Sequence, residues 1–381
     1  MKLITIHYTR KIVFGEKAFD QFVQDLASSN FKNIFIISIE EILPLIEYPL
    51  KALEKQNKKI VFDLSLRSEP TYKDFNRILQ NARQRQSDVV IGIGGGSSLD
   101  VAKLVAAQLK NDQSLKEIIG IGKLNTRRTP LICLPTTSGT GSEVSPNAIL
   151  LDEVEQLKKG VVSPHLMPDA SYIDPWLTHT MPPLVTASTG VDALTHCIEA
   201  YTNKFAHPII DVLVLEGIRL IGKNLITAVK DGQNMPARSA LSLGSMYGGM
   251  ALGPVNTAAV HALSYPLGGE FHIPHGVSNA VLLPYVMQFN IPVSVERYAK
   301  VARALGVKEE KNKKSMAEAG VQKIFELLKA CNLPTHLSEL NIPSEAIDKM
   351  ARSAIKVTRL LKNNPRPITL EDAKTIYERA F

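Results

Sequence analysis

Short runs of apolar and β-branched residues alternate with helix-period stretches along the first part of the chain. The apolar runs are NIFIIS (33–38), IVFDLSL (60–66), VVIGIGGG (89–96), LICLPTT (131–137) and ASYIDP (170–175). Each is too short for a helix and is bounded by turn residues, so it is typical of a buried strand. The alternation predicts an α/β fold with a doubly wound, mostly parallel sheet.

The second half of the chain has a different pattern. After Asp174-Pro175 the strand-like runs stop, and long segments with helical spacing follow, such as 184–204 and 208–231. Pro182 and Pro183 are good residues for a helix start. We therefore predict two domains: 1–178, an α/β domain that binds NAD(P), and 179–381, an all-helical domain that binds metal and substrate.

Composition narrows the class of protein. The chain has 381 residues, of which 45% are hydrophobic, and this is more than a single hydrophobic core usually accommodates. The length therefore also favours two domains with a cleft between them. The net charge of +7 is spread thinly, so no basic run indicates a nucleic-acid or membrane partner. The start MKLITIHYTRKIVFG lacks the apolar stretch of a signal peptide, and no run is long enough to span a membrane, so we expect a cytoplasmic protein. Three scattered cysteines exclude a disulfide framework.

A glycine-rich turn follows one of the predicted strands. The segment IGIGGGSSLDVAK (91–103) leads from that strand into a helix that we expect to begin near Ser97. Glycines allow a phosphate to approach the backbone, and the free amides of a helix start attract it, so the turn predicts pyrophosphate binding. The motif lacks the usual acidic residue about twenty positions on, and it is not a Walker motif. Alternatively, Ser97 and Asp100 form a capping box, and Lys103 is a solvated helix residue.

A second polar turn, PTTSGTGSEVS (135–145), also follows an apolar strand. The hydroxyls of Thr136, Thr137, Ser138 and Thr140 could bond to phosphate, ribose or the nicotinamide carboxamide, or could simply cap their own turn. Open α/β sheets bind ligands at the carboxyl ends of their strands, and two such turns at that edge favour the ligand interpretation.

Four residues have the types and spacing of a metal site. Asp192 and His196 lie four residues apart on a predicted helix, so their side chains share one face. His261 is placed near the end of an apolar helix, and His275 after a predicted loop, SYPLGGEFHIP (264–274). One carboxylate and three imidazoles suit Fe(II) or Zn(II). His272 is an additional histidine, which could bind substrate, relay a proton or serve no chemical purpose.

These motifs together resemble the iron-containing (group III) alcohol dehydrogenases. The resemblance runs almost from end to end and rests on GIGGGSSLDVAK (92–103), LPTTSGTGSEVS (134–145), IDPWLT (173–178), MPPLVTASTGVDALTHCIEAY (181–201), HALSYPLGGEFHIPHGVSNAVLLPYVM (261–287) and the tail 363–381. It implies the two-domain fold of dehydroquinate synthase, with Asp192, His196, His261 and His275 as metal ligands. It also implies an NAD(P) site bordered by Gly94, Gly95, Gly96, Ser97, Ser98, Asp100, Thr136, Thr137, Ser138, Thr140, Ser142 and Lys159.

The chain departs from its apparent relatives at two places. Many of them carry a histidine four residues after the third ligand, where this chain has Tyr265; Tyr265 and His272 are therefore our candidates for catalytic proton handling. Relatives that prefer NAD often have an aspartate after an early strand. Here Ile39 or Glu40 holds that position, depending on a one-residue shift of alignment. The choice between NAD and NADP stays open at this point.

The expected activity is metal-dependent hydride transfer between C4 of a nicotinamide and a small alcohol or aldehyde. Alternatives are a reductase of a functionalised aldehyde or a maleylacetate-like keto acid, a lyase of the dehydroquinate synthase kind, and a cofactor-binding protein without activity. The segments 184–203 and 250–284 contain almost no Lys or Arg, which disfavours the phosphorylated substrate of such a lyase. We expect a homodimer, and no nucleic-acid or membrane partner.

Overall fold

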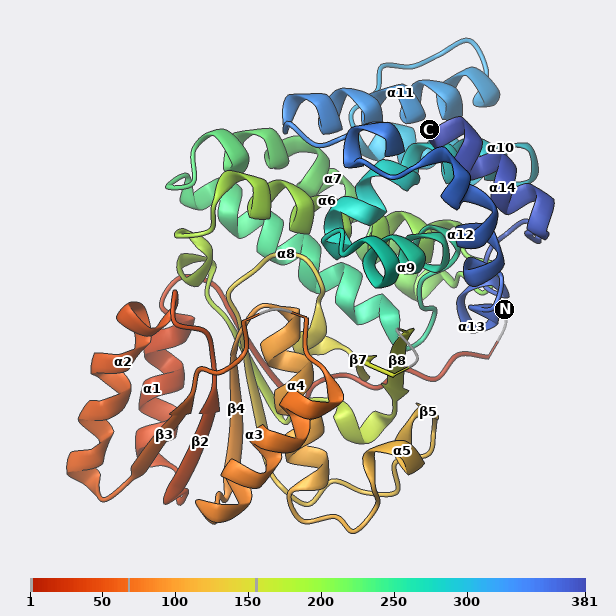
Figure 1. Cartoon of the computed structure of the whole chain (residues 1–381). Helices are drawn as coiled ribbons and strands as arrows, with labels where there is room; N and C mark the ends of the chain where they lie inside the picture. Colours follow the sequence, from red (N-terminus) through yellow and green to blue (C-terminus); the bar gives the residue numbers. More distant parts are fainter. Residues whose placement is uncertain (1–2, 68, 155–156) are drawn as a thin grey trace. The chain divides into compact units, whose positions relative to one another are not determined.

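The computed structural model describes residues 3–67, 69–154 and 157–381. The chain divides into two compact units. The sheet unit holds Ile6–Thr137 and Gly141–Thr180, and the helical unit holds Ser138–Thr140 and Met181–Phe381 together with residues 3–5. Figure 1 shows the elements of each unit.

The sheet unit is built on six parallel strands in the order β1-β9-β6-β4-β2-β3. Their bounds are β1 Lys11–Phe14, β2 Asn33–Ile37, β3 Lys59–Asp63, β4 Val89–Gly94, β6 Leu131–Pro135 and β9 Ala170–Ile173. The chain adds β3 on one side of β2 and then returns to place β4 on the other side. The carboxyl ends of β2 and β4 therefore lie at a switch point of the sheet, where α/β folds commonly bind ligands.

Two helical layers cover the two faces of this sheet. Phe35 and Ile37 of β2 pack in one buried cluster with residues of α3 (Tyr72–Gln84) and α4 (Gly96–Gln108). Ile34 and Ile36 of the same strand pack in another cluster with residues of α1 (Ala18–Ser28) and α2 (Leu43–Lys51). Because successive strand side chains point to opposite faces, one apolar run supplies both cores.

A smaller sheet of three strands belongs to the same unit. β7 (Asn147–Asp152) and β8 (Leu157–Val162) pair in antiparallel fashion, and β5 (Gly120–Ile121) adds in parallel to β8. These strands were not predicted from the sequence.

The helical unit consists of long helices around a buried central one. The longer helices are α6 Pro183–Thr202, α7 Pro208–Lys230, α8 Met235–Leu252, α9 Ala259–Phe271, α10 His275–Ala304, α11 Lys313–Ala330 and α14 Leu370–Ala380, with the short α12 Ile347–Ala354 and α13 Thr358–Leu361. From Thr186 onward nearly every residue of α6 is buried. It packs against α7, α8 and α10, and this burial fixes the orientation of any polar side chain that α6 carries.

The predicted fold class, a parallel α/β region followed by an all-helical one, is confirmed. Two local predictions are wrong. His261 is the third residue of α9, not near the end of a helix, and most of the predicted loop 264–274 is helical, with Pro266 inside α9. Only His272, Ile273 and Pro274 separate α9 from α10.

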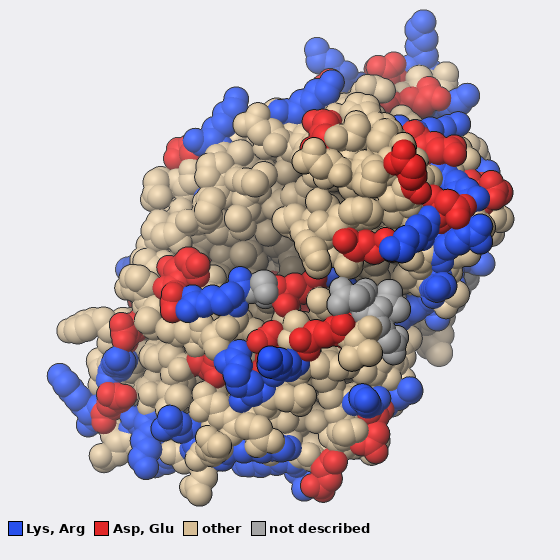
Figure 2. Space-filling model, viewed as in Figure 1, with Lys and Arg blue, Asp and Glu red and all other residues tan. Residues whose placement is uncertain are grey.

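The surface carries charges of both signs. Figure 2 shows one face, on which Lys and Arg side chains are scattered among Asp and Glu. The excess of 44 basic over 37 acidic residues is therefore not gathered into one patch on this face. Among the described residues, no helix combines the length and the hydropathy needed to span a membrane.

Candidate metal centre and nucleotide-binding turns

One face of α6 carries three buried ionisable side chains. Asp192, His196 and Glu199 are buried, with at most 5% of each residue exposed. They follow one another at intervals of four and three residues, which is the spacing of one helical face. Buried charged groups need partners or an ion, so this face marks a chemical site.

His261 of α9 and His275 of α10 meet this face. Oδ1 of Asp192 lies 3.6 Å from Nε2 of His261, 3.7 Å from Nε2 of His275 and 3.9 Å from Nε2 of His196. One ligand atom from each of Asp192, His261 and His275 lies within 4.8 Å of the other two. His196 is not part of that set of three, although its ring stacks on that of His261 with centroids 4.7 Å apart.

Glu199 controls the orientation of His261. One carboxylate oxygen is 2.5 Å from Nδ1 of His261, and the other accepts from the backbone amide of Val260 at 2.6 Å. No side chain of α9 caps its own start, so Glu199 supplies this cap from α6. With its Nδ1 proton held by Glu199, the His261 ring turns Nε2 toward Asp192, and this nitrogen can bind a cation in place of a proton.

The electrostatics of the cluster favour a bound cation. Burial alone would raise the pKa of Asp192, but the imidazoles of His196, His275 and His261 hold it well below its usual range. Burial opposes charge on His261 as well, yet the carboxylates of Glu199 and Asp192 raise its pKa to about 10. Burial lowers the pKa of His196, whose Nδ1 is buried and makes no hydrogen bond. The cluster thus holds excess negative charge when its histidines are neutral.

This donor set fits a divalent transition ion. A carboxylate with imidazole nitrogens suits Fe(II) or Zn(II), and a carboxylate behind a ligating histidine is the usual support in such sites. Access differs among the residues: 33% of the His275 side chain is exposed, whereas Asp192, His196 and His261 expose 4–6% of theirs. Solvent therefore reaches the cluster on the side of His275.

The two predicted proton-handling residues lie in different surroundings. Tyr265 is half-buried in α9, with its ring centroid 6.5 Å from that of His275. Its hydroxyl oxygen accepts a hydrogen bond from Arg359 at 3.3 Å. His272 is exposed, and it ends α9 in a left-handed conformation with φ 55°. Only Tyr265 is thereby placed beside a proposed ligand.

The glycine-rich turn connects β4 directly to α4. The N-cap residue of α4 is Gly95, and no side chain caps this helix, which begins one residue before Ser97 at Gly96. The amide of Thr136 donates to the carbonyl of Gly94 at 2.9 Å, so the turn after β6 lies beside the turn after β4. An uncapped helix start next to glycine and threonine residues can accept a phosphate group.

Asp100 and Lys103 do not have the roles that the simpler alternatives gave them. Asp100 accepts from the Ser142 hydroxyl at 2.5 Å and from the Ile149 amide at 2.8 Å, so it joins the two turns and forms no capping box with Ser97. Lys103 is completely buried rather than solvated, and its ammonium donates to the carbonyls of Ser145 and Asn147, at 2.8 Å each.

The remaining predicted cofactor residues are divided between the units. Thr137 lies against Gly95, in the sheet unit. Ser138 and Thr140 belong to the helical unit, where the Ser138 hydroxyl is 2.9 Å from that of Ser242. Lys159 is in β8, opposite Leu150 of β7. Ser97 is exposed and Ser98 is buried in the first turn of α4.

The end of β2 bears on the choice of cofactor. The strand ends at Ile37, Ser38 is buried, and the half-buried Ile39 follows. Glu40 is exposed and pairs with Arg67 at 2.5 Å. The carboxylate of Glu40 is therefore already partnered by a cation, and no acidic side chain stands at Ser38 or Ile39.

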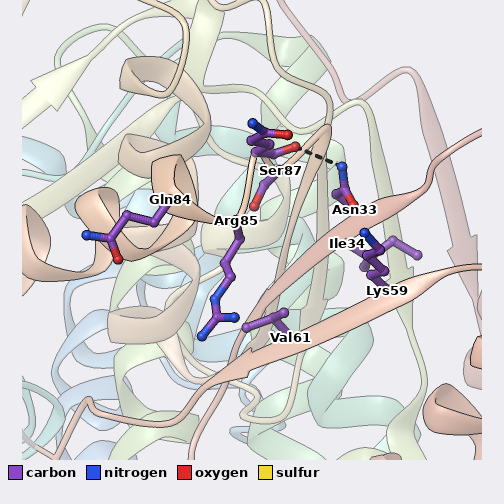
Figure 3. Close-up of a pocket in the computed structure, with 8 residues that line it drawn as sticks. Asn33, Ile34, Lys59, Val61, Gln84, Arg85 and Ser87 are labelled. Atoms are coloured by element: carbon purple, nitrogen blue, oxygen red, sulfur yellow. Dashed lines mark hydrogen bonds between the residues drawn. The ribbon is translucent and has the colours of Figure 1, made fainter.

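The sheet unit also has a hollow at the opposite edge of its sheet. It measures about 410 Å³ and lies at the amino ends of β2 and β3, lined by Asn33, Ile34, Lys59, Val61, Gln84, Arg85, Gln86 and Ser87 (Figure 3). An Asn33 side-chain bond to the carbonyl of Gln86, at 3.2 Å, crosses one side of it. Its position, away from the glycine-rich turn, separates it from the predicted nucleotide site.

Sequence reasoning missed two buried residues of the metal cluster. Glu199 lies seven residues after Asp192, and Asn279 lies four after His275, so helical spacing could have found both. Asn279 donates to Oδ1 of Asp192 at 2.7 Å. Glutamate and asparagine are weaker sequence indicators of a metal site than histidine. Here Glu199 nevertheless bonds to His261, and Asn279 bonds to Asp192.

A buried carboxylate–imidazole cluster in one unit and an uncapped, glycine-rich helix start in the other are typical of a metal-dependent, nucleotide-linked dehydrogenase. Comparison with known proteins narrows this class. The iron-containing alcohol dehydrogenase family matches residues 9–175, and the C-terminal domain of the Fe-containing alcohol dehydrogenase family matches residues 186–381. The chain belongs to the iron-containing alcohol dehydrogenase family.

Individual relatives align with this chain over nearly the whole length of both proteins. Long-chain-alcohol dehydrogenase 1 of Geobacillus thermodenitrificans is 37% identical over 96% of this chain and 94% of its own. The crystal structure of a 1,3-propanediol oxidoreductase superposes with a TM-score of 0.95 at 29% identity, covering 100% of both chains. Sulfoacetaldehyde reductase from Bifidobacterium kashiwanohense, solved with NAD+, has a TM-score of 0.89 at 28% identity and covers 100% of this chain and 99% of its own.

Proposed function

We propose that this protein is an NAD(P)-linked, metal-dependent alcohol dehydrogenase that interconverts a small primary alcohol and its aldehyde. The observation that carries the proposal is the convergence of Asp192, His261 and His275 within 4.8 Å, with Glu199 bonded behind His261. Membership of the iron-containing alcohol dehydrogenase family supports the same reaction class.

Asp192, His196, His261 and His275 are the proposed holders of Fe(II), or of Zn(II) in its place. When bound, the ion supplies Lewis acidity toward the substrate oxygen, and the nicotinamide donates or accepts the hydride. Glu199 keeps His261 in the tautomer that can bind a cation, and the partly exposed His275 borders the side from which substrate enters.

The proposed nucleotide site lies at the carboxyl edge of the sheet. Gly94, Gly95 and Gly96 leave room for the pyrophosphate, and the free amides at the start of α4, including those of Ser97 and Ser98, donate to it. Asp100 acts on this site through Ser142, because its oxygens already accept from that hydroxyl and from the Ile149 amide. The hydroxyls of Thr136, Thr137, Ser138 and Thr140, and the Lys159 ammonium, complete the proposed set.

Position 39 supports the use of either nicotinamide cofactor. A carboxylate after β2 would bond to the ribose hydroxyls of NAD and repel the 2′-phosphate of NADP. Ile39 has no such charge, and Glu40 is paired with Arg67. We therefore expect NADPH to be accepted beside NADH.

Tyr265 is the proposed proton donor to the aldehyde oxygen, in preference to the exposed His272. Arg359 donates to the hydroxyl oxygen of Tyr265, which leaves the hydroxyl proton free for another acceptor. The same guanidinium stabilises the phenolate that forms when the proton leaves.

The relatives indicate the range of substrates. Their names refer to long-chain alcohols, 1,3-propanediol and sulfoacetaldehyde. A short aldehyde, with or without a second polar group, is the proposed substrate class here. The proposed working form is a cytoplasmic homodimer, which size-exclusion chromatography with light scattering would test.

The test is oxidation of NADH and NADPH under anaerobic conditions with a panel of short aldehydes. Protein stripped by a chelator is compared with protein reloaded with Fe(II) or Zn(II), and His261→Ala is assayed alongside. Turnover that requires the ion, falls by at least about 10²-fold in the variant and occurs with both cofactors is expected. Bound nucleotide without turnover under either metal would contradict the proposal.

A further inference from the structure

Asn279 is not one of the four predicted ligands, yet it contacts three of them. The residue lies one turn after His275 in α10 and is completely buried. Its amide nitrogen lies 2.7 Å from Oδ1 of Asp192, 3.1 Å from Nε2 of His261 and 3.3 Å from Nε2 of His275. These are the atoms that would bind a cation, so this side chain is part of the cluster.

An amide nitrogen and a cation compete for the same lone pairs. A neutral imidazole has one acceptor nitrogen with a single lone pair, which either accepts an N–H or binds a metal. The two hydrogens of the Asn279 amide also cannot serve three acceptors fully. The amide N–H groups of Asn279 therefore cannot remain directed at Nε2 of His261 and Nε2 of His275 when those nitrogens bind an ion.

The other end of the amide indicates what replaces them. Oδ1 of Asn279 is buried and makes no hydrogen bond. A carboxamide oxygen carries two lone pairs and loses free energy when it is buried without a partner. Half a turn about the terminal bond of the side chain exchanges the oxygen and the nitrogen with almost no change in shape.

We propose that Asn279 is a fifth protein group of the metal centre, whose amide turns so that Oδ1 faces the bound ion. This inference rests on the proposed function only in requiring that an ion binds at all. In the loaded site the amide oxygen gains a positive partner, and the repulsion between the ion and the amide N–H groups is removed.

A fifth group changes which ion the site prefers. Zn(II) is commonly satisfied by four ligands in a tetrahedron, whereas oxygen donors and higher coordination suit ions such as Fe(II). The amide oxygen of Asn279 adds one neutral oxygen donor to the carboxylate and three imidazoles. Its contribution is therefore larger for Fe(II) than for Zn(II).

The experiment measures metal binding instead of catalysis. Asn279→Leu has a similar size but no lone pair, and Asn279→Asp retains an oxygen. Anaerobic competition with a coloured chelator gives the Kd for Fe(II) and for Zn(II). The Co(II)-loaded proteins report coordination through the intensity of their d–d absorption bands, which is weak for five or six ligands and strong for four.

The expected result is a 10- to 100-fold weaker Kd for Fe(II) in Asn279→Leu, with a smaller change for Zn(II). The Co(II) bands should become stronger in this variant, while Asn279→Asp keeps the weak bands of the wild-type protein. Ser278→Ala is the matched control, because its hydroxyl bonds to the carbonyls of Ile273 and Pro274 and not to the cluster. It should leave both constants within about twofold.

Unchanged affinities and an unchanged Co(II) spectrum in Asn279→Leu would overturn the proposal. Tighter Fe(II) binding by the variant would overturn it as well, because the amide would then be an obstacle to the ion. Melting curves of the metal-free variants separate a binding effect from misfolding, and Asn279→Asp provides a second comparison. Failure of the wild-type protein to bind metal would instead count against the proposed function.

Discussion

At the scale of single residues, Tyr265 is the side chain that we propose as the proton donor. Tyr265→Phe keeps the ring beside His275 but removes the hydroxyl that accepts from Arg359. We expect kcat for aldehyde reduction to fall about 10²-fold, because a positioned proton donor is lost. Metal affinity should not change.

The matched control is Tyr285→Phe. This substitution also removes a tyrosine hydroxyl. The hydroxyl of Tyr285, however, donates to the carbonyl of Thr335 and not to a residue of the metal cluster. Its kcat should remain within about twofold of the wild-type value. A Tyr265→Phe enzyme with the wild-type kcat would transfer the role to bound water or a ribose hydroxyl.

Glu143 gives the protein a pH-dependent stability. It is almost completely buried, and burial raises its pKa from 4.5 to about 7. Between these two values the folded state holds a proton that the unfolded state has lost. Stability therefore falls as pH rises through this window, by up to about 3 kcal/mol in free energy of unfolding.

Glu143→Gln should remove this loss. Melting temperatures of chelator-treated wild-type and variant protein, measured from pH 4.5 to 8, are expected to diverge in favour of the variant as pH increases. Two curves that remain parallel over the whole range would show that Glu143 is ionised in the folded protein.

Sequence spacing points to the proposed metal ligands more readily than to the residues that support them. Asp192 and His196 could be paired because both are common ligands four residues apart on a helix. The role of Asn279 depends on how α10 packs against α6 and α9. A single sequence does not show which helices pack together. The sequence places Lys103 as a solvated helix residue, because only the fold shows that it reaches the Ser145 and Asn147 carbonyls.

At the scale of elements, the start of α10 is held tightly against α6. A Cβ on Gly276 would lie 2.4 Å from the carbonyl oxygen of Ser188, a backbone atom that cannot easily move. Gly276→Ala should therefore cost about 1–3 kcal/mol of stability. It should also weaken metal binding, since the adjacent His275 must shift with the helix.

Gly190→Ala provides the comparison on α6, two residues before Asp192. The new Cβ would meet only a terminal methyl of Leu225, which can rotate away. Alanine also favours a helix over glycine by about 1 kcal/mol, so the net change should be close to zero. Urea midpoints and chelator competition measure both effects, and equal behaviour of the two variants would contradict this view of the α6–α10 contact.

Element prediction succeeded where apolar runs were long and failed where local residues opposed the fold. The strands β2, β4 and β6 were found within a few residues of their observed ends, and Pro182-Pro183 marks the start of α6. Residues 264–271 were assigned to a loop because Pro266, Gly268 and Gly269 disfavour a helix. Burial of Leu263 and Leu267 stabilises α9 in spite of them.

At the scale of the whole molecule, metal binding should add to the stability of the fold. The cluster joins α6, α9 and α10, and an ion that binds only the folded chain stabilises it by mass action. At 100 times the Kd the gain is about 2.7 kcal/mol. Differential scanning fluorimetry should show a higher melting temperature with Fe(II) or Zn(II) than with a chelator, and no such shift in His261→Ala.

The arrangement of the molecule in two parts was accessible from the sequence for a physical reason. Strand-like runs end near residue 175, and helical periodicity continues to the end, so fold class follows from pattern alone. The proposed boundary at 178 stays a prediction. The placement of Ser138–Thr140 with the helical unit was not predicted, because a turn of three residues has no periodicity.

Direct detection of hydride transfer tests the central claim most sharply. NADH and NADPH deuterated at C4 are supplied under anaerobic conditions with an aldehyde that is reduced by the Fe(II)-loaded protein, and the alcohol is analysed by mass spectrometry. We predict one deuterium at the carbinol carbon per NAD(P)+ formed, from the loaded enzyme and from neither the chelated protein nor His261→Ala. Alcohol without deuterium, or the same labelled product in the absence of metal, would contradict a metal-dependent alcohol dehydrogenase.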